Sequence, residues 1–386
     1  MTALSTVELS LRIGQGFPTA APAYLMRALR RVEVTQQDSA PCGFQLTFLT
    51  EIASAGSVFD IVADPLLVPF NRVVLRAAVN GVPVTLMDGF ITHQQFAPGN
   101  GPDDSQFVVT GEDISVVMDL VDYSREFPAM PDVATVAEVL APWLALGIAP
   151  TIIPSPTSLV PIDYVPQQAE TDRALLQRLA QANGNVFYIS PTDVLFVNEA
   201  YWGPPPRFTP PTAVIDVAVG AASTADSFSA QYNALAPETF FGESTETLIE
   251  PYEPIPIATF ASTRFPPLAA VPALTQNPLF SRHTLWRDDQ LDPVRAVLTA
   301  QSRTNVSTDE VVSVNCSFAP ARLGTVVSAP GVVGVRGTGQ SYDGLYYLKS
   351  ATHQISLLAD TGWDYTQQLT MTREGTGTTT PVLKAS

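Results

Sequence analysis

The three histidines of the chain are the side chains best suited to acid–base chemistry, because an unperturbed imidazole titrates near neutral pH. His93, His283 and His353 each stand alone in the sequence. A Ser-His-Asp triad is defined by geometry and not by order along the chain, but no G-x-S-x-G elbow is present to support one. We therefore interpret all three as hydrogen-bonded structural histidines and predict no catalytic residue.

Two further segments have the composition of a ligand site but not its spacing. Asp288, Asp289 and Asp292 could offer oxygens to calcium, yet the alternate-residue ligands, glycine and distal glutamate of a calcium loop are missing. They are interpreted as a solvated turn before a helix. Residues 334–339 (GVRGTG) are glycine-rich like a phosphate-binding loop, but they lead into another strand and not into a helix N-terminus. A β-turn region is the better interpretation, so we expect neither a metal nor a cofactor.

Two cysteines, Cys42 and Cys316, lie far apart, and no CxxC or Cys/His spacing of a zinc site is present. Both are expected to be buried and unpaired, because assembly in the cytoplasm keeps thiols reduced. The N-terminal residues alternate apolar with polar types and lack the basic start and apolar stretch of a signal peptide. Synthesis is therefore expected in the cytoplasm.

Length and composition indicate a folded chain of two or three domains. The 386 residues are 46% hydrophobic and 15% charged, which excludes a disordered chain. A formal net charge of −17, from 37 acidic and 20 basic residues, disfavours phosphate binding, so no nucleic-acid specificity is expected. Charged residues interrupt every apolar run well short of the ~20 residues that cross a bilayer, which predicts no membrane span.

The elements that position these residues are mainly strands in the first third of the chain. Period-two alternation, which predicts an antiparallel β unit, occurs in residues 8–13, 44–49, 72–79 and 106–110. Residues 98–104 (PGNGPDD) predict a flexible polar loop that projects from the sheet, because glycines permit positive φ and prolines prevent pairing.

The pattern changes near Gly111, where apolar residues return every three or four positions. This period predicts helices over residues 133–146 and 172–182. In the second helix Thr171 or Asp172 can cap the first amides, and Gly184 can supply the left-handed stop. A hairpin of strands 186–189 and 194–197 is expected to follow.

Residues 202–278 are unusually rich in proline, and long regular elements are not expected there. One interpretation is an ordered arm that packs in extended form on a neighbouring subunit, and the other is a loose linker. The segment also contains Phe240, Phe241, Tyr252, Phe260 and Phe265. Because free linkers seldom carry so many aromatic residues, the ordered arm is favoured.

A third helix and a second β unit are predicted after this segment. Asp292 as N-cap and Pro293 at the first helical position predict the start of the helix. Alternation resumes in residues 311–318, 325–327, 345–358 and 365–372, although no residue-level repeat relates them to the first β unit.

The C-terminal segments 342–353 (YDGLYYLKSATH) and 365–375 (YTQQLTMTREG) resemble the end of baseplate hub proteins. These are the late-control D-type hubs of contractile phages and of extracellular contractile injection systems, which are also similar to the N-terminal part of type VI secretion spikes. The resemblance spans nearly the whole chain. Further blocks agree in order: 41–48 (PCGFQLTF), 88–91 (DGFI), 109–113 (VTGED) and 172–187 (DRALLQRLAQANGNVF). Residues 227–237 and 262–269 are similar to hubs whose spike is a separate polypeptide.

The resemblance implies a β-rich α+β fold with two tail-tube-like antiparallel β-barrel domains joined by smaller α+β elements. The expected boundaries are a first tube-like β domain in residues 1–112, an α+β domain in 113–205, a proline-rich segment and arm in 206–285 that partly contributes to the second β domain, the second tube-like β domain in 286–375, and a tail in 376–386.

For function, the resemblance implies a structural baseplate hub and not an enzyme. Such a hub is a homotrimer that adapts a threefold spike to a sixfold inner tube. Its partners would be a separate spike protein, the ring of tube protein and other baseplate proteins of a phage tail or tail-like particle. The acidic excess is expected on the lumen and exterior of this ring, because a negative wall discourages DNA or acidic cargo from binding.

Two other classes of function remain as alternatives. A glycan or peptidoglycan hydrolase at the tip of the device needs two carboxylates ~5–9.5 Å apart in a cleft, and the sequence selects no such pair. A carbohydrate-binding β protein would use exposed aromatic side chains such as Trp202 or Trp363 to stack on sugars. Core packing would explain both tryptophans equally well.

Overall fold

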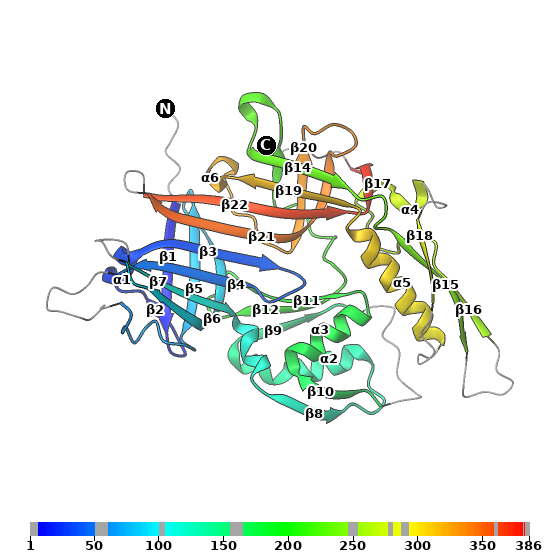
Figure 1. Ribbon diagram of the computed structural model, residues 1–386, viewed down its shortest axis with the longest axis horizontal. Coiled ribbons are helices and arrows are strands. Elements are labelled where there is room, and N and C mark those ends of the chain that lie inside the picture. Colours follow the sequence, from blue (N-terminus) through cyan, green and yellow to red (C-terminus); the bar gives the residue numbers. More distant parts are fainter. Residues whose placement is uncertain are drawn as a thin grey trace.

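The structure is a computed structural model in which two β-rich regions share one long sheet (Figure 1). It describes residues 7–50, 61–99, 105–154, 165–245, 254–276, 281–286, 293–358, 362–380 and 382.

The first β region contains the strands that the alternation predicted. Its elements are β1 (Val7–Gly14), β2 (Thr19–Ala20), α1 (Ala23–Ala28), β3 (Leu29–Gln37), β4 (Gly43–Leu49), β5 (Arg72–Val79), β6 (Val82–Ala97) and β7 (Gln106–Asp113). The strands lie in the order β3-β4-β7-β6-β5-β1-β2 with antiparallel pairing throughout. Strands β1 and β3 to β7 contribute apolar residues to a common core, mostly at alternate positions, which is why period two is visible in the sequence; the short β2 is exposed. Most of the predicted loop at 98–104 falls outside the described residues.

A smaller α+β region follows in the chain and lies along one side of the long sheet (Figure 1). Its elements are η1 (Ile114–Asp119), β8 (Asp122–Glu126), α2 (Asp132–Leu140), η2 (Ala141–Leu146), β9 (Ile148–Ile152), β10 (Gln167–Thr171), α3 (Asp172–Ala182), β11 (Val186–Pro191) and β12 (Asn198–Gly203). Helix α3 has the predicted bounds. Thr171 Oγ1 accepts a hydrogen bond from the Ala174 amide at 3.2 Å, and Gly184 adopts φ +62° after the helix.

Two predictions in this region were wrong. The helix expected over 133–146 changes at Ala141 into a 3₁₀ turn, because Pro142 has no amide to continue the α-helical pattern. Residues 194–197 form a turn and not a strand, and β11 pairs instead with β12, which begins at Asn198. The turn holds Phe196 at φ +67° and is closed by the Thr192 hydroxyl, which donates to the Val197 carbonyl at 2.8 Å.

The second β region comprises the remaining elements. These are β13 (Val214–Asp216), η3 (Gly220–Ala222), β14 (Ala225–Tyr232), β15 (Glu238–Thr245), β16 (Pro254–Ala258), β17 (Ala269–Pro272), α4 (Ala273–Gln276), β18 (Arg282–Leu285), α5 (Pro293–Asp309), β19 (Val312–Phe318), α6 (Pro320–Leu323), β20 (Gly331–Arg336), β21 (Gly344–Leu358), β22 (Gly362–Arg373) and β23 (Gly375–Thr378). Strands 311–318, 345–358 and 365–372 and the helix starting at Pro293 are thereby confirmed.

Strand β21 joins the two β regions directly. Its first part pairs with β20, and its second part pairs with β3 along the same edge. On its other edge β21 pairs with β22, and the register of that pairing shifts between Leu348 and Ser350. The sheet therefore runs without interruption in the order β14-β19-β22-β21-β3-β4-β7-β6-β5-β1-β2. Separate apolar cores lie in the two regions, and Ile355 and Tyr365 from β21 and β22 belong to the first core. The expected β-rich α+β class with two antiparallel β units is confirmed.

The proline-rich segment contains longer regular elements than predicted. Strands β14 and β15 each have eight residues, because the prolines cluster outside them. Strand β14 pairs with β19 in the long sheet. Strand β16 contains proline and lies at the edge of its sheet. Proline is tolerated in an edge strand, because Pro256 lacks only the backbone amide that would donate to a further strand.

The strand predicted over 325–327 was also wrong. Here the Gln367 side chain replaces a neighbouring strand: its Nε2 donates to the Val327 carbonyl at 2.8 Å, and its Oε1 accepts from the Val327 amide at 3.1 Å. The strand of this part of the chain is β20, which includes Gly334 and Arg336 of the glycine-rich segment.

Candidate functional site

The three histidines lie in three different places and all accept or donate local hydrogen bonds. His93 lies at an exposed position of β6, and its Nδ1 is 2.9 Å from the Thr92 hydroxyl. His283 Nδ1 is 2.7 Å from the Thr239 hydroxyl. His353 is fully buried, and its recorded side-chain partners are Tyr365, Gln36 and Gln367. None of these partners is a serine or a carboxylate, so His353 has no triad geometry.

The surroundings of His353 determine its protonation. Complete burial lowers its pKa to about 3, so the ring is neutral at physiological pH. Gln367 Nε2 lies 3.0 Å from Nδ1, and Gln36 Oε1 lies 3.2 Å from Nε2. A neutral ring with its proton on Nε2 satisfies both contacts, since Nδ1 then accepts and Nε2 donates.

The other residues singled out by composition are the three aspartates and the two cysteines. Asp288, Asp289 and Asp292 fall outside the described residues. Within the part of the chain that is described, no three His, Cys, Asp or Glu side chains gather as metal ligands. No helix of that part is long and apolar enough to span a membrane. Cys42 and Cys316 are buried free thiols in different apolar cores, as expected, and burial raises the pKa of both.

Trp202 cannot stack on a sugar, because its side chain is fully buried in the α+β core and its Nε1 donates to the Leu176 carbonyl. Trp363 is half-buried against the first core. Trp202 and Trp363 therefore act in core packing, and the alternative interpretation, stacking on sugars, does not apply to Trp202.

A cavity whose lining mixes charged and apolar side chains lies where the regions meet. Its volume is about 620 Å³. The turn after β3 contributes Asp38, the segment after α3 contributes Asn185, α5 contributes Arg303 and Asp309, and β21 contributes Tyr347. We call this cavity the junction cavity.

Asp38 and Tyr347 form a buried polar pair at the junction cavity. The Tyr347 hydroxyl donates to Asp38 Oδ2 at 2.7 Å, and this contact links the turn after β3 to β21. Burial raises the pKa of Asp38. Burial and the negative charge of Asp38 together raise the pKa of Tyr347 well above its ordinary value. Nearby Lys349 forms an ion pair with Glu310, so the cation next to Asp38 already has a partner.

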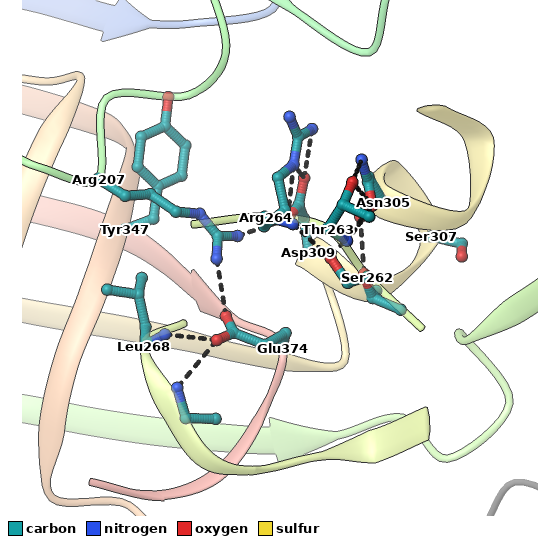
Figure 2. Close-up of polar contacts among 12 residues, drawn as sticks. Arg207, Ser262, Thr263, Arg264, Leu268, Asn305, Ser307, Asp309, Tyr347 and Glu374 are labelled. Atoms are coloured by element: carbon teal, nitrogen blue, oxygen red, sulfur yellow. Dashed lines mark hydrogen bonds and ion pairs between the residues drawn. The ribbon is translucent and has the colours of Figure 1, made fainter. Parts of the chain in front are cut away.

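Beside the cavity, two buried and two half-buried charged side chains form a second connection, which we call the arginine–carboxylate cluster (Figure 2). Arg207, only 1% exposed, donates from NH1 to Glu374 at 2.9 Å and also pairs with Asp309. Arg264 binds the same Asp309 carboxylate through Nε and NH2, at 3.1 and 2.8 Å to Oδ2. Glu374 further accepts from the Ala269 amide at 2.9 Å.

These contacts fix the proline-rich segment on α5 and on the end of β22. Asn305 adds to them, since its Oδ1 accepts from the Thr263 amide at 2.8 Å (Figure 2). The carboxylates of the cluster are engaged by guanidinium groups or backbone amides, which holds the charged oxygens in place. This arrangement suits a rigid junction better than proton transfer, which needs a carboxyl group free to change its proton.

Sequence analysis did not identify the arginine–carboxylate cluster. Glu374 lies in the C-terminal segment that carried the family resemblance, but the resemblance gave it no role. Arg207 follows three consecutive prolines and has no distinctive neighbour. The two residues are 167 positions apart, so no local pattern connects them.

An exposed aromatic patch lies on the same segment. Phe208, Phe260 and Phe265 are 72%, 79% and 70% exposed. The rings of Phe208 and Phe265 pack on each other with centroids 5.5 Å apart. The contact between Phe208 and Phe265 leaves most of both rings open to solvent.

Comparison with solved structures shows which proteins share this fold. A tail protein from Neisseria meningitidis is 14% identical, covers 96% of this chain and 98% of its own length, and gives a TM-score of 0.60. The 43 kDa tail protein of a Shewanella oneidensis prophage is 12% identical, with 96% and 99% covered and a TM-score of 0.63.

A third similar structure belongs to a secretion system. It is an Escherichia coli protein described as a component of the type VI secretion system with similarity to the bacteriophage T4 tail proteins gp27 and gp5. It is 10% identical, with 100% of this chain and 78% of its own chain covered and a TM-score of 0.55. No protein-family model matches the sequence, and no curated protein matches it either. The chain therefore has the fold shared by these phage tail and type VI secretion proteins, with its two tail-tube-like β domains.

Proposed function

We propose that the chain is the structural hub of a contractile baseplate, a homotrimer that adapts a threefold spike to a sixfold inner tube. The observation that carries the proposal is the pair of β units within one chain, joined through β21. Three such chains supply six β units around one axis, which matches a hexameric tube ring on one side and a threefold spike on the other.

The edges and surface of the chain agree with a closed ring. Within the described chain the long sheet ends in β14 on one side and in the two-residue β2 on the other. Open sheet edges promote uncontrolled association unless an assembly pairs or covers them. The aromatic patch of Phe208, Phe260 and Phe265 supplies the apolar contact that an obligate subunit interface needs.

The remaining parts take their place in this arrangement. We assign residues 1–112 and 286–375 to the two tube-like domains, 113–205 to the α+β domain, 206–285 to the segment that contacts a neighbouring subunit, and 376–386 to a tail. A separate spike protein, the tube ring and other baseplate proteins would be the partners, in a phage tail or tail-like particle. The fold it shares with tail proteins and the engaged carboxylates support a role without catalysis.

Mass photometry and native mass spectrometry of the purified chain test the proposal. We expect a species of three 41.3 kDa chains, and electron microscopy should show six β lobes around a threefold axis. A chain that remains a single 41.3 kDa species at micromolar concentration would refute it. A hydrolase alternative would require release of soluble fragments from purified peptidoglycan, which we do not expect.

A further inference from the structure

One face of the long sheet carries an unusual set of side chains where the two β units meet. Two rows of directly paired residues cross the strands β14, β19, β22, β21 and β3, and we call them the polar rows. The first row is Ser229, Asn315, Thr370, Ser350 and Gln37. The second row is Ser227, Ser317, Gln368, Thr352 and Thr35.

All ten side chains of the polar rows are uncharged hydroxyls or amides, and all are exposed or half-buried. The chain is 15% charged, so ten positions taken at that rate would hold one or two charges. Lys349 and Glu310, which form an ion pair with each other, line the same hollow as Gln37, Ser350 and Thr370, so the charges beside the rows cancel. The rows also contain no large apolar side chain.

Contacts within the rows hold these side chains to one another. The hydroxyls of Ser227 and Ser317 lie 2.6 Å apart, and Thr370 donates to Asn315 at 3.2 Å. Thr35 and Thr352 are 3.4 Å apart across the boundary between the two β units. The polar rows are thus an ordered surface with part of its hydrogen bonding satisfied internally.

This composition excludes the usual kinds of tightly bound partner. A dry subunit interface needs apolar or aromatic groups at its centre, and the rows have none. A phosphate backbone needs lysine or arginine, which the rows lack. What remains is a surface in contact with water that a passing molecule touches without being held.

We propose that the polar rows form a charge-free section of the wall of the central passage, past which polypeptide cargo of either charge sign moves without being held. The inference rests on the proposed trimeric ring. Three chains would place three such sections around the axis, each covering the boundary between two β units. The composition of the sequence predicted an acidic wall, whereas the polar rows predict a neutral one at this level of the passage.

Single cysteines test the position of the rows. The native thiols give little background, because both are buried and burial raises the pKa of Cys316 to about 12. Ser350→Cys is compared with Val194→Cys, a 64% exposed site in the α+β region, and with Phe265→Cys in the aromatic patch. In the assembled ring, Ser350→Cys should react with a small maleimide within about twofold of its rate in the dissociated chain, whereas Phe265→Cys should slow at least tenfold.

A maleimide-gold label then locates the site in averaged electron micrographs. On Ser350→Cys the gold density should lie toward the threefold axis, and on Val194→Cys it should lie at a different radius. Protection of Ser350→Cys on assembly, or gold density at the outer rim, would overturn the inference while leaving the ring intact. A chain that never assembles would overturn the proposed function as well, so the two failures are distinguishable.

Charge neutrality has its own measurement. Fluorescently labelled poly-glutamate should show no saturable binding to the wild-type ring at low salt, and any poly-lysine binding, which the net charge of −17 per chain favours, should be unchanged by substitutions in the polar rows. Ser350→Lys, which places three cations in the passage, should bind poly-glutamate at least tenfold more tightly and lose that binding at high salt. Tight binding of either peptide to the wild-type ring, lost in a polar-row variant, would contradict a wall that does not hold its cargo.

Discussion

Replacing Arg207 by methionine tests whether the arginine–carboxylate cluster holds the proline-rich segment in place. Methionine keeps most of the side-chain volume but removes the charge and every donor. Removal of one partner from a buried ion pair costs about 3–5 kcal/mol, because the other charge stays buried without compensation. Here both carboxylate partners are shielded, with Glu374 at 3% and Asp309 at 15% side-chain exposure.

Three details of the structure place the expected loss at the lower end of this range. Glu374 still accepts from the Leu268 and Ala269 amides, and Asp309 still binds Arg264. Among the described residues the buried Arg207 Nε has no hydrogen-bond partner, so its removal relieves a penalty of about 1 kcal/mol. We therefore expect Arg207→Met to lower the free energy of unfolding by about 3 kcal/mol.

Urea unfolding followed by tryptophan fluorescence measures this loss. With a slope near 3 kcal/mol per molar urea, the midpoint should fall by about 1 M. Arg282→Ala is the matched control, because the Arg282 side chain is 70% exposed and forms a surface ion pair, with its Nε 3.6 Å from Glu238 Oε1. A surface pair of this kind contributes about 0–1 kcal/mol, so the midpoint of the control should hardly move.

A double-mutant cycle separates the ion pair from loss of packing. Glu374→Gln keeps an acceptor for the two backbone amides but removes the charge. Combined with Arg207→Met, it should recover part of the loss, with a coupling energy of about 1.5–3 kcal/mol. Additive effects, or an Arg207→Met midpoint within error of the wild type, would show that the cluster does not stabilise the junction.

Four other outcomes follow from the structure. Burial lowers the pKa of His353 to about 3, so as the pH falls below about 6.5 the unfolded chain takes up a proton on this residue before the folded chain does. The free energy of unfolding should therefore decline between pH 6.5 and 3, by about 2 kcal/mol at pH 5. His353→Gln should flatten this decline in acid-unfolding curves. Phe265→Ser should shift the trimer toward monomer at least tenfold by mass photometry while leaving the unfolding midpoint nearly unchanged, because this ring is 70% exposed in the single chain. Segment 202–278 should resist limited proteolysis in the assembled particle and be cut faster in a dissociated chain; equal cutting in both states would argue against a subunit contact. Mass spectrometry of protein alkylated before lysis should find Cys42 and Cys316 modified or free, and a peptide that links the two would contradict the buried reduced thiols.

Local sequence patterns correctly predicted those helices and strands whose apolar residues are regularly spaced and pack on one core. Strand β5 and helix α3 were predicted to the residue. Alternate residues of β5 from Val73 to Val79 enter the first core, although its other face is also largely buried, and the apolar residues of α3 recur every three or four positions. Residues 194–197 have the same apolar character as a strand, but the positive φ of Phe196 is set by the turn and leaves no trace in hydrophobicity. Propensity alone cannot distinguish the two cases.

Long-range pairings were beyond such patterns. Nothing in β3 or β21 specifies that Thr35 lies opposite Thr352, because the register depends on how the two β units dock. The arginine–carboxylate cluster was missed for the same reason: Arg207 and Glu374 meet only after the rest of the fold has formed. Charged residues within a proline-rich segment look like solvated surface until their partners are known.

The pairing of β3 with β21 also has a consequence for synthesis on the ribosome. Strand β3 leaves the ribosome early, but its partner is made more than 300 residues later, since Thr35 and Thr352 are 317 positions apart. At about 5–20 residues per second, the edge of β3 waits roughly 15–60 s for its neighbour. During that time the first core also lacks Ile355 and Tyr365. The nascent N-terminal unit is therefore an incomplete sheet whose β3 edge is open, the kind of intermediate that chaperones bind, and this edge is paired only when the C-terminal strands arrive.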